Sequence, residues 1–191
     1  MRLIRRLRPA VAAGLALAAG SAAAHTGEHT VSGFVSGFTH PFAGLDHLLA
    51  MVAVGLWAVQ QGGRALWAVP MAFVLAMLAG GALAGWGGTL PHIETGIAAS
   101  VLVLGLAVAI GRHVSLAFGV AAVAGFALFH GYAHGLEMPQ AAAPALYGLG
   151  FVAATVALHA AGIAGALVGR HAIRFAGAVI AASGAALLWL A

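Results

Sequence analysis

Long apolar runs alternate with short polar breaks along most of this chain. Runs of about 20 residues are long enough for an α-helix to cross a bilayer, and here they are separated by breaks rich in Gly, Pro or Arg. The connections between them are too short to fold separately. The pattern predicts an all-α membrane protein in which residues 25–191 form a bundle of six spans, near 42–60, 65–86, 93–111, 114–135, 143–168 and 172–190.

The first 24 residues have a different pattern. An arginine-rich start is followed by a short apolar segment from about Val11 to Gly20 and by small residues at Ala22 and Ala24. This order predicts a secretory signal peptide, residues 1–24, that is cleaved after Ala24. The apolar segment is shorter than the roughly 20 residues of a spanning helix. A retained helix with its amino end in the cytoplasm is the alternative, and both interpretations place residue 25 outside.

Composition narrows the class of protein further. Hydrophobic residues make up 63% of the 191 residues and charged residues 6%, against roughly half and a quarter in soluble domains. The net charge of +4 does not indicate a nucleic-acid partner, because half of the basic residues lie in the first eight positions. The chain has no cysteine, so disulfides, thiolate metal sites and thiol catalysis are excluded.

Charge predicts the orientation of the bundle. Arg64, Arg112, Arg170 and Arg174 fall in alternate connections, which the positive-inside rule assigns to the cytoplasm. The mature N-terminus is then expected on the opposite side, the periplasm, together with most of the carboxyl groups. An acidic outer face would favour the collection of cations.

The first candidate motif is His40-x5-Asp46-His47, at the start of the first predicted span. Pro41 suits the first helical position, so His40 is expected at the helix cap. On a straight helix His40 and His47 would share a face about 10 Å apart, too far to bind one ion. Binding by all three side chains needs a break, for which Gly44 is the expected pivot; otherwise Asp46 and His47 form the site and His40 lies at its entrance.

The second motif is FHGYAHGLEM, residues 129–138, at the end of the fourth predicted span. His130 and His134 are four residues apart on one helical face, a spacing with which two imidazoles can bind one divalent ion, and Glu137 continues that stripe. Gly131 and Gly135 form a small-xxx-small pattern that allows close helix packing, and the first span is the expected neighbour. Four crossings separate the start of the first span from the end of the fourth, so both motifs are expected at the same membrane face.

Imidazole and carboxylate ligands suit Ni²⁺, Co²⁺, Zn²⁺ or Cu²⁺ better than Mg²⁺ or Cu⁺. The alternative is that these side chains only form hydrogen bonds between helices. Ionisable residues are costly inside a membrane and usually mark a function, so a divalent-cation site is the favoured interpretation.

Taken together, His40-x5-Asp46-His47 followed by LLAM, and FHGYAHGLE over residues 129–137, resemble the two signature motifs of the HupE/UreJ family of nickel or cobalt permeases. The resemblance implies a bacterial inner-membrane transporter that supplies Ni²⁺ or Co²⁺ for hydrogenase or urease maturation. It implies no prosthetic cofactor, since the metal is the substrate. Its functional positions would be His40, Asp46, His47, His130, His134 and Glu137.

Five further residues are secondary candidates for the metal path. His92 and Glu94, after Pro91, could form an outer station or only cap the third span. His159, inside the fifth span, could relay the ion or form an interhelical hydrogen bond. His25 and His29 could capture metal at the mature amino terminus or belong to a solvated tail.

The expected mechanism is secondary uptake rather than enzymatic catalysis. Two positive charges that move down an inside-negative potential gain roughly 4.6 kcal/mol per 100 mV, so ATP is not needed. One rival hypothesis is an intramembrane zinc hydrolase in which His130 and His134 hold the metal and Glu137 acts as general base. Another is an accessory protein that binds metal without transporting it.

Overall fold

The computed structural model describes residues 33–139 and 143–191. The expected signal peptide, residues 1–24, and the candidates His25 and His29 lie outside the described residues. Within the described ranges the chain is helical and contains no strand. The elements are α2 (Gly33–Ala43), α3 (Leu45–Gln61), α4 (Ala65–Gly85), α5 (Ile93–Ile110), α6 (Leu116–Glu137), α7 (Pro144–Gly165), the 3-10 turn η1 (Ala166–Val168) and α8 (Arg170–Leu190).

Five of these segments are long and apolar enough to cross a membrane: α4, α5, α6, α7 with η1, and α8. Their ends agree with the predicted spans to within three residues. The pair α2 and α3 passes the same test jointly, but the two helices are bent by 86° relative to each other. The chain is therefore a multi-pass membrane protein, and its described residues supply five spans, or six if the bent pair counts as one.

The prediction that His40 caps the first span and that its helix runs on from Pro41 is wrong. His40 and Pro41 lie inside α2, which ends at Ala43, and Gly44 separates it from α3. Gly44 has an extended backbone (φ −99°, ψ 117°). A Cβ atom at this position would lie 2.7 Å from Asp46 Oδ1 and 3.0 Å from His47 Nδ1. The structure thus has the break at Gly44. The sequence predicted this break only for the case in which all three side chains of the motif bind one ion.

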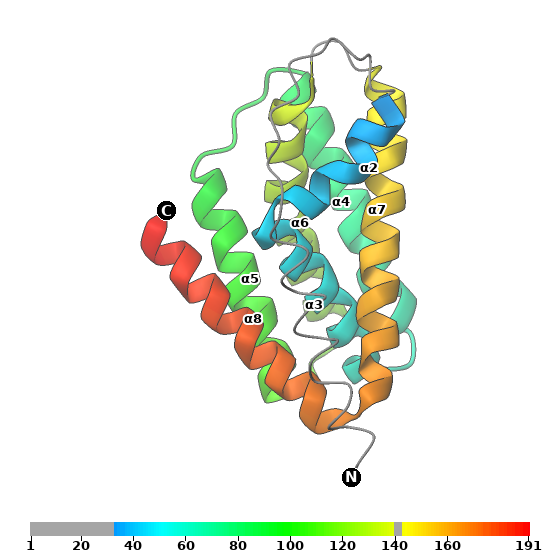
Figure 1. Cartoon of the computed structure of the whole chain (residues 1–191), viewed down its shortest axis with the longest axis vertical. Helices are drawn as coiled ribbons and strands as arrows, with labels where there is room; N and C mark the ends of the chain where they lie inside the picture. Colours follow the sequence, from blue (N-terminus) through cyan, green and yellow to red (C-terminus); the bar gives the residue numbers. More distant parts are fainter. Residues whose placement is uncertain (1–32, 140–142) are drawn as a thin grey trace, which may run out of the picture. The chain divides into compact units, whose positions relative to one another are not determined.

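Helix α3 packs against α4, α5, α7 and α8 (Figure 1). Most of its residues from Ala50 to Ala58 are buried, as expected for a helix that is surrounded by others. Its approach to α7 is close, because a Cβ atom on Gly55 would overlap the carbonyl oxygen of His159, and one on Gly162 would overlap that of Val52. In a membrane the hydrophobic effect does not drive helices together, so close van der Waals packing at such small residues holds α3 against α7.

The expectation that the glycines of α6 contact the first span is also wrong. A Cβ atom on Gly131 would overlap the carbonyl oxygen of Met77 on α4, and one on Gly135 would lie 2.8 Å from the carbonyl oxygen of Gly81. Helix α4 contributes a small surface of its own, since a Cβ atom on Gly80 would overlap the carbonyl oxygen of Leu128 on α6. Two matched small surfaces allow these two helices to approach closely.

Arginines lie in the α3–α4 and α5–α6 connections and in the first two turns of α8, at one end of the bundle that is here called the arginine end. Gln61, which precedes the Arg64 connection, donates a hydrogen bond from Nε2 to the carbonyl oxygen of Arg112 (2.9 Å). Arg174 Nη2 donates to the carbonyl oxygen of Ile110 (2.6 Å). The arginines are therefore together, as the positive-inside rule requires of a cytoplasmic face.

Candidate metal centre

The bend at Gly44 brings the first motif against the carboxyl end of α6. His40 Nε2 lies 2.9 Å from Glu137 Oε2, although the two residues are 97 positions apart. His134 Nδ1 lies 3.7 Å from the same oxygen. One ligand atom from each of these three residues lies within 4.8 Å of the others. These three residues, His40, His134 and Glu137, are here called the outer trio. Because transition-metal bonds to nitrogen or oxygen are about 2 Å long, small side-chain rotations would bring their ligand atoms around one ion.

A second group of imidazoles lies deeper in the bundle. The His47 ring centroid is 4.1 Å from that of His134 and 4.7 Å from that of His130. All three side chains are buried, whereas His40 and Glu137 are 28% and 53% exposed. His134 belongs to both groups. The structure therefore gathers the histidines of both motifs, with His134 between the outer trio and the buried pair His47 and His130.

Asp46 contacts His47 in two ways. Its Oδ1 atom accepts hydrogen bonds from the His47 backbone N–H and from the Nδ1 side of the ring, both at 2.7 Å. A neutral imidazole carries one proton, so this contact places the proton on Nδ1. His47 Nε2 is buried and has no hydrogen-bond partner among the described residues. Carboxylates commonly orient metal-binding histidines in this way.

A pocket of about 310 Å³ opens onto both motifs. It lies at the end of the bundle opposite the arginines, here called the histidine end. Its walls are formed by α2, α3, α5 and α6, with His40, Asp46, His47, Glu94, His134 and Glu137 among the lining residues.

The two outer-station candidates on α5 differ in position. Glu94 lines this pocket and also lies in the first turn of α5, where a carboxylate is favourable in any case. His92 is the N-cap residue of α5, with a left-handed backbone (φ 56°), and its side chain makes no capping hydrogen bond. Of the pair, Glu94 is the one that the structure brings to the metal candidates.

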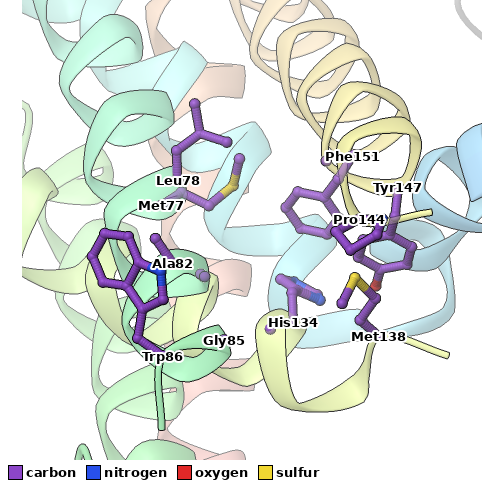
Figure 2. A pocket seen from close by; sticks show the side chains of 14 residues that line it. Met77, Leu78, Ala82, Gly85, Trp86, His134, Met138, Pro144, Tyr147 and Phe151 are labelled. Carbon is purple, nitrogen blue, oxygen red and sulfur yellow. The ribbon is translucent and has the colours of Figure 1, made fainter. Parts of the chain in front are cut away.

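A second hollow, of about 410 Å³, reaches His134 from another side (Figure 2). Its lining residues come from α4, α6 and α7 and from the residues that directly follow α4 and α6. They are mostly apolar and include Met77, Trp86 and Phe151. The Phe151 ring centroid lies 3.9 Å from that of His134. The ring of His134 thus packs against the apolar ring of Phe151 as well as against the imidazoles of His40 and His47, which restricts its orientation.

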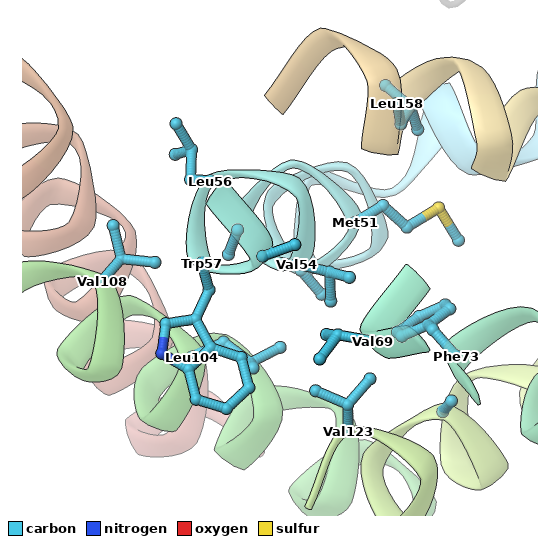
Figure 3. Close-up of a cluster of buried hydrophobic side chains, with 14 of the residues drawn as sticks. Met51, Val54, Leu56, Trp57, Val69, Phe73, Leu104, Val108, Val123 and Leu158 are labelled. Carbon is cyan, nitrogen blue, oxygen red and sulfur yellow. The ribbon is translucent and has the colours of Figure 1, made fainter. Parts of the chain in front are cut away.

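The arginine-end side of the cluster is filled by tightly packed side chains. Phe73 on α4 is fully buried and contacts His130 and His159, with ring centroids 5.7 Å and 5.2 Å away. Met51, Val54 and Val69 lie in the same apolar cluster (Figure 3). His159 is buried, and neither ring nitrogen has a hydrogen-bond partner among the described residues. Of the two alternatives for His159, the interhelical hydrogen bond is therefore not seen among the described residues. The ring of Phe73 contacts both His159 and His130.

One buried polar residue at the centre was not anticipated from the sequence. Ser100 on α5 has no exposed surface, and its hydroxyl oxygen lies 2.7 Å from His130 Nε2. The available signal was a single serine within an apolar helix, which is weak because serines often bond to their own helix backbone.

These features define a polytopic helical membrane protein with clustered imidazole and carboxylate side chains near one end of the bundle. A family model described as HupE / UreJ protein matches residues 13–187, and the chain belongs to that family. It is 50% identical over 117 residues to "Protein HupE" of Rhizobium leguminosarum bv. viciae. The matched region spans 61% of this chain and 61% of that relative's length. No solved structure matches the chain.

Proposed function

We propose that this protein carries a divalent transition-metal ion, Ni²⁺ or Co²⁺, across the bacterial inner membrane by secondary transport and so supplies metalloenzyme maturation. The observation that carries the proposal is the meeting of His40, His134 and Glu137, whose ligand atoms lie within 4.8 Å of one another. Membership of the HupE/UreJ family supports the same conclusion, because the resemblance of the two motifs to that family implies nickel or cobalt uptake.

Capture begins at the outer trio. His40 and Glu137 are partly exposed, and Glu94 and Asp46 add carboxyl groups to the same pocket. A hydrated cation is attracted by this negative charge and exchanges water for imidazole and carboxylate ligands, a set suited to Ni²⁺ and Co²⁺.

His134 then transfers the ion inward, because it is shared between the outer trio and the buried imidazoles. His47 offers Nε2, the nitrogen that Asp46 leaves free. His130 is the next ring, 4.7 Å from His47 by centroid. Beyond His130 the ion must pass Phe73 to reach His159, so this side chain has to move during transport.

The membrane potential is sufficient to set the direction. A divalent cation that moves to the negative side gains roughly 4.6 kcal/mol per 100 mV. The periplasmic location of the histidine end follows from the positive-inside rule, with the arginines in the cytoplasm. In proteoliposomes a potassium diffusion potential, negative inside, should therefore accelerate Ni²⁺ entry.

The decisive experiment is uptake of radioactive nickel by such proteoliposomes. His47→Ala and His134→Ala should each reduce uptake to near the level of empty vesicles. His171→Ala is the matched control, because His171 is an exposed residue near the arginine end and should leave uptake unchanged. Equal uptake by the wild type and both site variants would overturn the proposal.

The same preparation separates the rival hypotheses. A hydrolase would retain tightly bound stoichiometric zinc after purification, since three protein ligands with a water molecule form a catalytic zinc site. An accessory protein would bind Ni²⁺ without flux into vesicles. Exchangeable Ni²⁺ binding together with potential-driven flux is the result that we expect.

A further inference from the structure

Ser100 lies at the buried side of the histidine cluster, on a helix that carries neither metal motif. Its Oγ atom is 2.7 Å from the carbonyl oxygen of Ile97 and 2.7 Å from His130 Nε2. Ser100 and His130 are both completely buried. Water therefore has no access to the hydroxyl group or to this ring, and the hydrogen bonds must be satisfied between these groups.

The two short distances determine which atom carries each proton. A hydroxyl group has one hydrogen, and a carbonyl oxygen can only accept. Ser100 must donate to Ile97, because two oxygens 2.7 Å apart without a hydrogen between them repel each other. The Ser100 oxygen then accepts from His130, whose proton is on Nε2. The nitrogen with a free electron pair is His130 Nδ1, which is buried and has no hydrogen-bond partner among the described residues.

His47 has the opposite arrangement, because Asp46 holds its Nδ1 proton and leaves Nε2 free. In the buried pair His47 and His130, each ring thus has one nitrogen bound to a neighbouring side chain and one nitrogen left for a ligand. Metal-binding histidines commonly have such a partner on the nitrogen that does not bind the metal. We propose that Ser100 is a positioning residue of the metal path, which holds His130 in the Nε2–H tautomer so that Nδ1 is its metal-binding atom. This inference rests on the proposed transport function.

A purely structural role for Ser100 makes a different prediction. A serine that bonds to its own helix backbone is common and needs no partner. If the bond to Ile97 were the whole role, removal of the hydroxyl group would not change the tautomer of His130. Ser183 on α8 is a matched case, since its hydroxyl donates to the carbonyl oxygen of Val179 (3.1 Å).

The first test reads the tautomer directly in the metal-free full-length protein. Nitrogen NMR of histidine labelled with ¹⁵N distinguishes a protonated from an unprotonated ring nitrogen, and the His130 signals are identified by their loss in His130→Asn. We expect protonated Nε2 in the wild type and in Ser183→Ala, and a mixture of both tautomers in Ser100→Ala. A wild-type His130 with its proton on Nδ1 would overturn the inference, even if Ser100→Ala cannot be purified.

The second test measures equilibrium Ni²⁺ binding to the purified protein. Loss of an outer partner typically weakens metal binding about 10–100-fold, so Ser100→Ala should do so while Ser183→Ala should not. In a His130→Ala background the same Ser100→Ala change should have no further effect. An equal loss in both backgrounds would refute the positioning role. If the wild type neither binds nor transports Ni²⁺, the proposed function fails, whereas the NMR result still decides whether Ser100 sets the tautomer.

Discussion

Asp46 lies beside the metal candidates but bonds to its neighbour His47, through both the backbone N–H and the ring. At the scale of single residues this geometry favours an orienting role for the carboxylate over direct ligation. The motif His40-x5-Asp46-His47 identifies Asp46 as a candidate. Whether its carboxylate binds the metal or orients His47 depends on side-chain rotamers, which the motif does not specify.

The two roles of Asp46 predict different substitution series. An orienting side chain needs only an acceptor oxygen, so Asp46→Asn should retain Ni²⁺ affinity within a few-fold, whereas Asp46→Ala should lower it on the order of 10-fold or more. Titration of the purified variants with Ni²⁺ measures both. Similar large losses for Asn and Ala would show that the negative charge itself binds the ion.

At the scale of elements, the bend between α2 and α3 decides whether the first motif can meet α6. A straight helix would separate His40 from His47 by about 10 Å, and His40 could not then lie 2.9 Å from Glu137 while His47 packs on His134. Broken helices with binding sites at the break are a recurrent feature of secondary transporters. The pivot at Gly44 is therefore part of the site.

Gly44→Ala should damage the site without unfolding the bundle. The added Cβ atom would lie 2.7 Å from Asp46 Oδ1 and 3.0 Å from His47 Nδ1. The hydrogen bond by which Asp46 orients the His47 ring must therefore shift. We expect Ni²⁺ uptake to fall several-fold while thermal unfolding in detergent changes little. Gly125→Ala on α6, where a Cβ atom meets nothing within 4 Å, is the control. Normal uptake by Gly44→Ala would show that the tight turn is not needed.

For Gly131, unlike Gly44, the contact between α4 and α6 predicts that substitution by alanine lowers the stability of the bundle. A Cβ atom there would overlap the backbone of Met77, which cannot move away as a flexible side chain can. Gly131→Ala should lower the free energy of unfolding by about 1–3 kcal/mol, the usual cost of overpacking. Thermal unfolding in detergent measures this, again against Gly125→Ala. Unchanged stability would mean that the two helices are less closely packed than described.

At the scale of the whole molecule, the distribution of charge along the bundle predicts its orientation. The arginine-bearing connections lie at one end and the histidine–carboxylate pocket at the other. The positive-inside rule then predicts that the pocket faces the periplasm. Because the chain has no cysteine, this orientation can be tested without background labelling.

Thr89 and His113 are exposed residues in connections at the histidine end and the arginine end, respectively. We expect a membrane-impermeant thiol reagent to label Thr89→Cys in intact spheroplasts and His113→Cys only after the membrane is permeabilised. The reverse pattern would invert the direction of the proposed uptake.

Several features of the molecule could be predicted from local patterns. Hydropathy predicted the ends of α4 to α8, because the transfer of a helix into lipid depends on about 20 consecutive residues. Histidine spacing identified His130, His134 and Glu137 as one stripe, because helical periodicity alone determines it. The partner of the glycines of α6 was predicted wrongly, since small residues indicate close packing but not the neighbour.

By itself, the amino-acid sequence determined the class of protein, the approximate spans and the chemistry of the candidate ligands, all of which depend on neighbouring residues along a helix. Only the tertiary structure decided that α2 turns by 86° into α3, that α6 packs on α4, and that Ser100 bonds to His130 across 30 positions. Each of these depends on which distant surfaces can approach closely. That is a property of packing in three dimensions, to which hydropathy and periodicity are insensitive.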